Sequence, residues 1–185
     1  TKMISFTKLL DSLPEEKLNI KLDSLKNENK LIEEKYINHD IKYKTVSITA
    51  DDVHDFAWMC DLQYLVRKTN HNNIMVYIFT LHQNYIKWLP TLGFANDAIE
   101  YMSRWYGPYI YPAFSIVDSQ NPYGGMEYPN LIQCAVQDLL GTRALEQVLF
   151  HETGHQWFYG MLGNNEMDEP WLDEGLTMFS EMRYF

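Results

Sequence analysis

The pattern of apolar and polar residues divides the chain into a first part that favours strands and a second part that favours helices. Apolar and hydroxyl side chains alternate over residues 45–50, which predicts a half-buried strand. The apolar run 74–80 follows the turn-forming residues 70–73 and predicts another strand. Residues 1–35 are polar with a few leucines at helical spacing, which indicates a short helix or a surface insertion.

The middle of the chain mixes helical and strand periodicity. Apolar residues share one face over 94–106, and Gly107-Pro108 follows as a stop signal, so we expect a helix there. The runs 114–117 and 131–136 predict two strands. A glycine-rich turn at 121–125 lies between these two strands.

The last third of the chain predicts two helices. Thr142 is a suitable N-cap for the first, which is apolar over most of its surface. The second begins near Pro170, a residue that the first turn of a helix tolerates. The order of elements predicts an α+β protein with a domain boundary near His82, giving a β-rich part over 1–82 and a part over 83–185 that is first mixed and then helical.

Composition narrows the class of protein without defining its function. Apolar residues make up 46% of the 185, enough for a packed core. The net charge of −10 comes without a basic cluster, which argues against nucleic acid as a partner. The apolar run 74–79 is too short for a membrane span, and no leader segment is visible, so localisation stays open. Both ends interrupt their local pattern, and we interpret the chain as a fragment.

The strongest chemical signal is an H-E-x-x-H motif at residues 151–155. On a helix, His151 and His155 lie one turn apart, so both imidazoles can bind one metal ion. Glu174 follows nineteen positions after His155 and offers a third, anionic ligand. Two imidazoles and one carboxylate leave a fourth position for water, as in a catalytic zinc site. Glu152 then becomes the candidate general base.

Several further residues could have either a functional or a structural role. Glu181 lies two turns after Glu174, and it is either a hydrogen-bond partner of a ligating histidine or a surface glutamate. Gly154 costs about 1 kcal/mol of helix propensity relative to alanine, which fits a place where a neighbouring strand or a ligand must come close. His54 and Asp55 could be catalytic partners, but a packing role is the better interpretation.

The motif residues, with Trp171-Leu172-Asp173-Glu174-Gly175, resemble the aminopeptidase N family of gluzincin metallopeptidases. Gly124-Gly125-Met126-Glu127 matches that family's G-x-M-E-N motif, which lies upstream of the zinc helix. The resemblance covers residues 45–185. It implies the tail of a β-sandwich-like domain, followed by the opening half of a thermolysin-like catalytic domain with a mixed sheet and zinc-binding helices.

The resemblance also implies a role for each motif residue. His151, His155 and Glu174 would bind one zinc ion, and Glu152 would activate water for attack on the first peptide bond. Glu127 would bind the free α-amino group of a peptide substrate, which favours an exopeptidase. The edge strand that would pair with the peptide backbone is formed by Gly124, Gly125 and Met126.

Two departures from the family pattern keep alternatives open. The asparagine that follows the motif glutamate in the family is Tyr128 here. The family's tyrosine that stabilises the oxyanion lies downstream of the third ligand, whereas this chain ends at Phe185. We therefore expect the 185-residue piece to be weakly active or inactive. An endopeptidase of the same class, or a zinc-binding homologue without catalysis, remains the alternative to an aminopeptidase.

Overall fold

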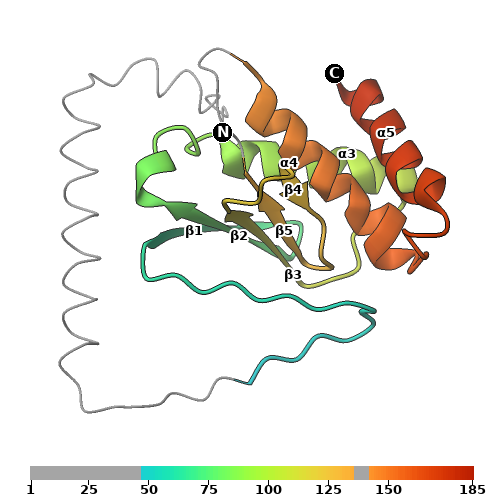
Figure 1. The fold of residues 1–185 in the computed structure, drawn as a ribbon, viewed down its shortest axis with the longest axis horizontal. Coiled ribbons are helices and arrows are strands. Elements are labelled where there is room, and N and C mark those ends of the chain that lie inside the picture. The colour runs from blue at the N-terminus through green and yellow to red at the C-terminus, as the bar shows by residue number, and fades with distance from the viewer. Residues whose placement is uncertain (1–46, 136–141) are drawn as a thin grey trace.

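The computed structural model describes residues 47–135 and 142–185, which form a five-stranded sheet with helices packed on one face (Figure 1). The sheet has the order β1-β2-β3-β5-β4. Its strands are β1 (Tyr64–His71), β2 (Ile74–Leu81), β3 (Ala113–Asp118), β4 (Gly125–Met126) and β5 (Leu131–Cys134). The helices are η1 (His82–Asn84), α3 (Thr91–Tyr106), α4 (Ala144–His155), η2 (Gln156–Met161), η3 (Trp171–Gly175) and α5 (Leu176–Tyr184).

The sheet is mixed, as expected from the sequence. β1 and β2 form an antiparallel hairpin, and its turn residues Asn72 and Asn73 have φ values of 50° and 68°. Asparagine tolerates this left-handed backbone better than most residues do. After the crossover through α3, β3 runs parallel to β2, and β5 runs parallel to β3. The short strand β4 pairs antiparallel with β5 and is the last strand of the sheet.

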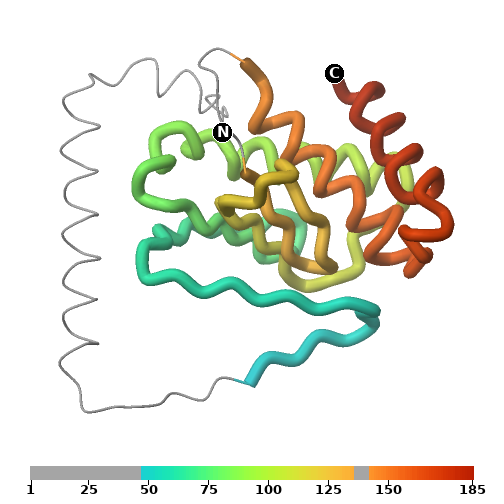
Figure 2. Tube along the Cα trace, viewed as in Figure 1, coloured from blue at the N-terminus to red at the C-terminus, as the bar shows by residue number. Residues whose placement is uncertain are grey.

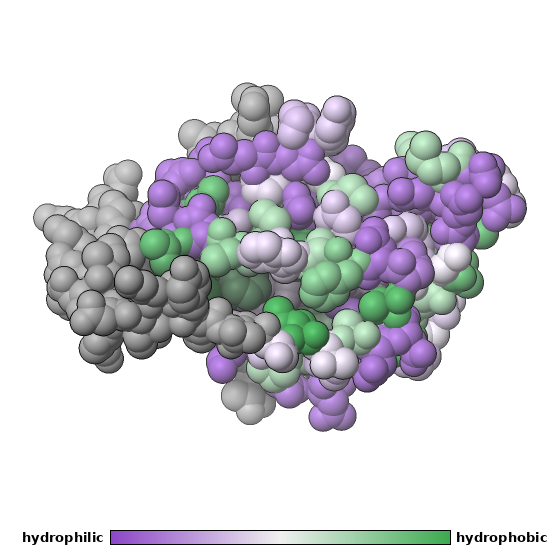
Figure 3. Space-filling model, turned by 60° about the horizontal axis from the view of Figure 1, so that its bottom comes forward, coloured by the Kyte–Doolittle hydropathy of each residue, from purple (hydrophilic) through white to green (hydrophobic). Residues whose placement is uncertain are grey.

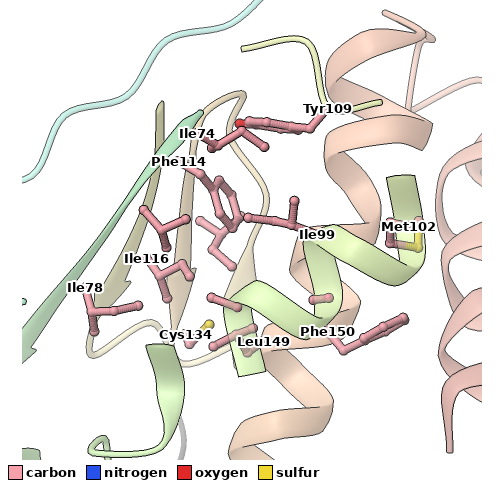
Figure 4. Close-up of a cluster of buried hydrophobic side chains, with 14 of the residues drawn as sticks. Ile74, Ile78, Ile99, Met102, Tyr109, Phe114, Ile116, Cys134, Leu149 and Phe150 are labelled. Atoms are coloured by element: carbon pink, nitrogen blue, oxygen red, sulfur yellow. The ribbon is translucent and has the colours of Figure 1, made fainter. Parts of the chain in front are cut away.

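The core lies between the sheet and helices α3 and α4, as Figure 4 shows. Alternate residues of β2 point into it, because successive side chains of a strand face opposite sides of the sheet. The helices contribute small and large apolar residues at helical spacing, and this packing fixes α4 against the sheet. Among the buried side chains are Ile74, Val76, Ile78, Ala98, Ile99, Met102, Phe114, Ile116, Leu149 and Phe150.

The segment that precedes β1 runs along the opposite face of the sheet, where Figure 2 shows it as an extended tube. Between residues 48–59 and the sheet lies a groove of about 530 Å³, with Phe79, Ser115 and Val117 in its wall. Apolar side chains gather at the centre of the face that Figure 3 presents. Tyr111 holds the segment in place, because its hydroxyl donates to the carbonyl of Asp52 at 3.1 Å.

The structure confirms most predicted elements and corrects two of them. The strand expected at 45–50 is wrong over its described part, since residues 47–50 are exposed and pair with no described strand. The helix expected to start at Thr142 has Arg143 as its N-cap instead. The helix or insertion expected within 1–35 lies outside the described residues. None of the helices in the described ranges has the length and apolarity that a membrane crossing requires.

The boundary expected near residue 82 falls inside the sheet. β2 ends at Leu81, and its register with β3 runs from Met75↔Ala113 to Phe79↔Val117. A unit starting at residue 83 would therefore lose two of the five strands. We propose instead that any domain boundary lies before β1, because β2 pairs along both edges, antiparallel with β1 and parallel with β3.

Candidate metal centre

Helix α4 carries the H-E-x-x-H motif along the face that meets α5, η3 and the edge strand β4. Leu149 and Phe150, which directly precede the motif, are fully buried in the core, and the Phe150 ring stacks on Tyr184 of α5. His155 is also almost fully buried, with 1% of its surface exposed, whereas His151 is partly exposed. The apolar flanks of the motif therefore hold one end of the helix rigidly and orient both imidazoles toward η3.

Three potential ligand atoms converge at one point. His155 Nε2 lies 3.1 Å from His151 Nε2. Glu174 Oε2 lies 3.2 Å from His151 Nε2 and 3.7 Å from His155 Nε2. A tetrahedral zinc ion with bonds of about 2.0–2.1 Å requires its ligand atoms to stand roughly 3.3 Å apart. The observed triangle fits this requirement. It brings together the three ligands expected from the sequence.

The other nitrogen of each imidazole faces a carboxylate. His151 Nδ1 lies 3.0 Å from Glu181 Oε2, and His155 Nδ1 lies 2.5 Å from Asp173 Oδ1. A carboxylate accepts hydrogen bonds, so each Nδ1 carries the proton and each Nε2 presents a lone pair. Two lone pairs and a carboxylate oxygen then point at one another. Such an arrangement repels itself unless a cation lies between them, and this is our main reason to regard the site as a metal centre.

Sequence reasoning identified Glu181 as a possible histidine partner but missed Asp173. The signal that could have found Asp173 is its place directly before Glu174 in a chain segment that must approach the metal. In a regular helix, adjacent side chains diverge by about 100°, so Asp173 and Glu174 were not expected to reach the same imidazole. The structure has a π-helical turn, η3, at this point, and π-turns are frequent at functional sites.

The carboxylate of Glu152 lies against strand β4 and close to His155. A Cβ atom added to Gly125 would lie only 1.8 Å from Glu152 Oε1, so the glycine leaves the space that this carboxylate occupies. The other oxygen, Oε2, is buried and has no hydrogen-bond partner among the described residues. Burial, followed by the negative charge of Glu127, raises the pKa of Glu152 to about 8. A divalent cation beside it would act in the opposite direction.

Glu127 follows β4 and lies on the same side of the metal centre as Glu152. Carboxylate oxygens of Glu127 and Glu152 and a ring nitrogen of His155 all lie within 4.8 Å of one another. Glu127 is largely buried, and burial raises its pKa. Carboxylate oxygens of Glu127, Glu166 and Asp173 also lie within 4.8 Å of one another. The centre is therefore strongly acidic on the side of Glu127, which suits a cationic group.

The glycine-rich turn that precedes Glu127 lies next to α4. Gly124 has a φ of 98°, and Gly125 and Met126 form β4 at the edge of the sheet. A hollow of about 220 Å³ opens between this edge and α4. It is lined by Tyr123, Gly124, Gly125, Gln147, Val148, His151, Glu152 and Glu181. Gly125 of the edge strand, His151 and Glu152 thus line one hollow.

Two other predicted positions have structural contacts. Gly154 lies where α4 crosses α5, and an added Cβ would lie 2.9 Å from Thr177 Cγ2. The close neighbour is therefore a helix rather than a strand or ligand. His54 and Asp55 lie against η2, where His54 Nε2 is 2.9 Å from the Tyr159 carbonyl oxygen and the Tyr159 hydroxyl donates to Asp55 Oδ2 at 3.0 Å. Both residues pack the extended segment onto η2.

A helix-borne pair of histidines, a glutamate from the next helix and a glutamate beside the first ligand define a metallohydrolase of the gluzincin type. Comparison with known sequences identifies the family within this class. The model of the Peptidase family M1 domain matches residues 91–185. The chain belongs to this family. Membership implies a catalytic zinc ion, and the donor set described above fits one.

Individual relatives agree with this assignment. The chain is 36% identical to aminopeptidase B of Rattus norvegicus over 93 residues, which cover 49% of this chain and 14% of that protein. It is 34% identical to leukotriene A-4 hydrolase of Xenopus laevis over 87 residues, covering 46% of this chain and 14% of that protein. The chain thus spans about one seventh of the length of these relatives.

Among solved structures, an M1 zinc metallopeptidase from Deinococcus radiodurans superposes with a TM-score of 0.49 at 16% identity. The superposition covers 65% of this chain and 28% of that protein.

Proposed function

We propose that this chain carries the metal centre of a zinc aminopeptidase, which removes the first residue from peptides with a free N-terminus. The observation that carries the proposal is the triangle of His151 Nε2, His155 Nε2 and Glu174 Oε2, with both Nδ1 atoms held by carboxylates. A zinc ion bound there supplies Lewis acidity toward a carbonyl oxygen and lowers the pKa of water. The relatives named as aminopeptidases support the choice of peptides as substrates.

Glu152 is the residue that we assign to proton transfer. Its carboxylate is buried beside the ligand triangle and has one oxygen without a hydrogen-bond partner. A carboxylate placed in this way accepts a proton from the attacking water and later passes it to the leaving amine. The packing of Gly125 against Oε1 keeps the side chain in this position.

Glu127 is the residue that we assign to recognition of the substrate amine. It lies beside Glu152 and His155, so an ammonium group bound to it places the adjacent peptide bond near the metal. The neighbouring carboxylates of Glu166 and Asp173 add negative charge on this side, which favours a cation and disfavours a blocked, neutral N-terminus. This feature supports an aminopeptidase over an endopeptidase.

Replacement of Glu152 tests the assignment of the general base. In the intact protein, Glu152→Gln should lower kcat by at least about a hundredfold, because general acid–base catalysis contributes on the order of 10²–10⁴. Zinc content, measured by atomic absorption, should stay at the wild-type level because Glu152 is not a ligand. Turnover that persists in this variant would contradict the assignment. A wild-type protein that binds zinc without cleaving any peptide would indicate a non-catalytic homologue.

Replacement of Glu127 tests the preference for free N-termini. Glu127→Gln should raise KM and lower kcat for peptides with a free amine, since the charge-assisted contact to the ammonium is lost. We expect a loss of about tenfold or more in kcat/KM. The control substrate is the same peptide with an acetylated N-terminus, which the wild type should cleave poorly. If the variant loses activity equally on both peptides, Glu127 has a structural role.

A further inference from the structure

We propose that Asp173 is a positioning residue that holds His155 in the orientation and tautomer in which it binds zinc, and that Asp173 contributes more to zinc affinity than Glu181 does. The inference deepens the proposed function, because it rests on the metal centre assigned there. It assigns a role to a residue that is neither a ligand nor a general base.

The contact between Asp173 and His155 is buried on both sides. The two side chains are 2% and 1% exposed, and Asp173 Oδ1 lies 2.5 Å from His155 Nδ1. A carboxylate in such a place is costly unless it accepts a hydrogen bond or pairs with a cation. Thr177 Oγ1 is the other polar atom near Nδ1, but at 3.4 Å it is a weak partner. The geometry therefore makes Asp173 the group that fixes the proton of His155 on Nδ1.

The π-helical turn η3 explains how two adjacent acidic residues reach the same ring. Asp173 approaches Nδ1, while Glu174 Oε2 lies 3.7 Å from Nε2 of the same imidazole. The two carboxylates thus lie on opposite sides of His155, one as its hydrogen-bond acceptor and one as its fellow ligand. Because the residues are covalent neighbours, any shift of η3 moves the ligand and the positioning group together.

The matching contact at the first histidine is weaker. His151 and Glu181 are 20% and 17% exposed, and their Nδ1–Oε2 distance is 3.0 Å. Glu181 also accepts a hydrogen bond from Gln147 Nε2 at 2.6 Å through its other oxygen. Water competes for a partly exposed hydrogen bond, whereas a buried one is stronger in its low-dielectric surroundings. The order of importance for zinc binding is therefore Asp173 before Glu181.

The experiment measures zinc dissociation constants of the purified chain by competition with a chromophoric chelator. Asp173→Ala should raise the dissociation constant by about 10- to 100-fold, the usual cost of losing a partner of a metal-bound histidine. Asp173→Asn retains an acceptor for Nδ1–H but not the charge, so it should recover part of the loss. Glu181→Gln should cost less than Asp173→Asn.

Asp118→Asn is the matched control. Asp118 is equally buried and accepts hydrogen bonds from Leu81 N and Asn84 Nδ2, so its loss affects the fold but no histidine. An unchanged zinc affinity in Asp118→Asn, with a weaker affinity in both Asp173 variants, supports the proposal. Should Asp173→Ala fail to fold, Asp173→Asn alone decides.

Two results would overturn the inference. One is a dissociation constant within twofold of the wild type in the folded Asp173 variants. The other is an equal loss of affinity in Asp118→Asn, which would assign the effect to the fold. Both results leave the wild-type zinc site in place and hence leave the proposed function intact. A wild-type chain that does not bind zinc would instead overturn the proposed function itself.

Discussion

Gly125 shows how one missing side chain shapes the proposed active site. The place that its Cβ would take is occupied by Oε1 of Glu152, at 1.8 Å. Sequence reasoning expected Gly125 to line the path of the peptide backbone, and the structure adds that it makes room for the proposed base. The absence of a side chain at Gly125 therefore leaves room for Glu152 and also shapes the edge strand.

We predict that Gly125→Ala lowers kcat about a hundredfold, because a displacement of the order of 1 Å at a reacting group can cost that much. Zinc affinity should change little, since the three ligands lie on α4 and η3. Steady-state kinetics and zinc titration of the same preparation measure both effects. Gly93→Ala, where an added Cβ meets nothing within 4 Å, is the control and should keep its activity. Similar kinetics in the two variants would refute this role of Gly125.

Residue spacing alone predicted that His151 and His155 lie together, because two histidines four positions apart on a helix share a face whatever the rest of the fold does. Glu174 was within reach of the same reasoning, since it lies in a helix that follows closely. The contact between Asp173 and His155 could not be predicted in this way. It depends on the π-helical backbone of η3, which cannot be inferred from the residue types. The contact of Gly154 with Thr177 likewise depends on how α4 crosses α5.

At the scale of elements, the sequence predicted those whose periodicity is supported by tertiary packing. Strand β2 and helix α3 have buried faces that repeat at the expected spacing. Residues 47–50 have the same alternation but no paired strand among the described residues, so they remain exposed. Alternation of apolar and polar residues shows that a segment is compatible with a strand. The strand forms only where a neighbouring strand offers free backbone groups for pairing.

The same argument applies to the domain boundary. The order of the predicted elements suggested that two units meet near residue 82, but β1 and β2 belong to the sheet that supports the metal centre. Parallel pairing of β2 with β3 joins residues that α3 separates in the sequence. Such non-local pairing leaves no local signal, so the order of elements could not reveal it.

At the scale of the whole molecule, the metal centre concentrates negative charge in a chain whose net charge is already −10. Glu127, Glu152 and Asp173 are buried close to the ligand triangle, and Glu174 completes it. Like charges at short range oppose folding unless protons or a cation neutralise them. The cation that best fits the donor atoms is zinc, so zinc should stabilise the folded chain as a whole.

We predict that free zinc at 100 times its dissociation constant stabilises the chain by about 2.7 kcal/mol, because the ion binds the folded state selectively. For a chain of this size, that corresponds to a rise in Tm of roughly 5–10 °C. Thermal unfolding followed by circular dichroism, with EDTA-treated protein as the reference, measures the shift. His155→Ala removes a ligand and should abolish the shift, while Mg²⁺, which prefers oxygen ligands, should not reproduce it. An equal Tm with zinc and with EDTA would show that the three ligands do not bind zinc in the folded chain.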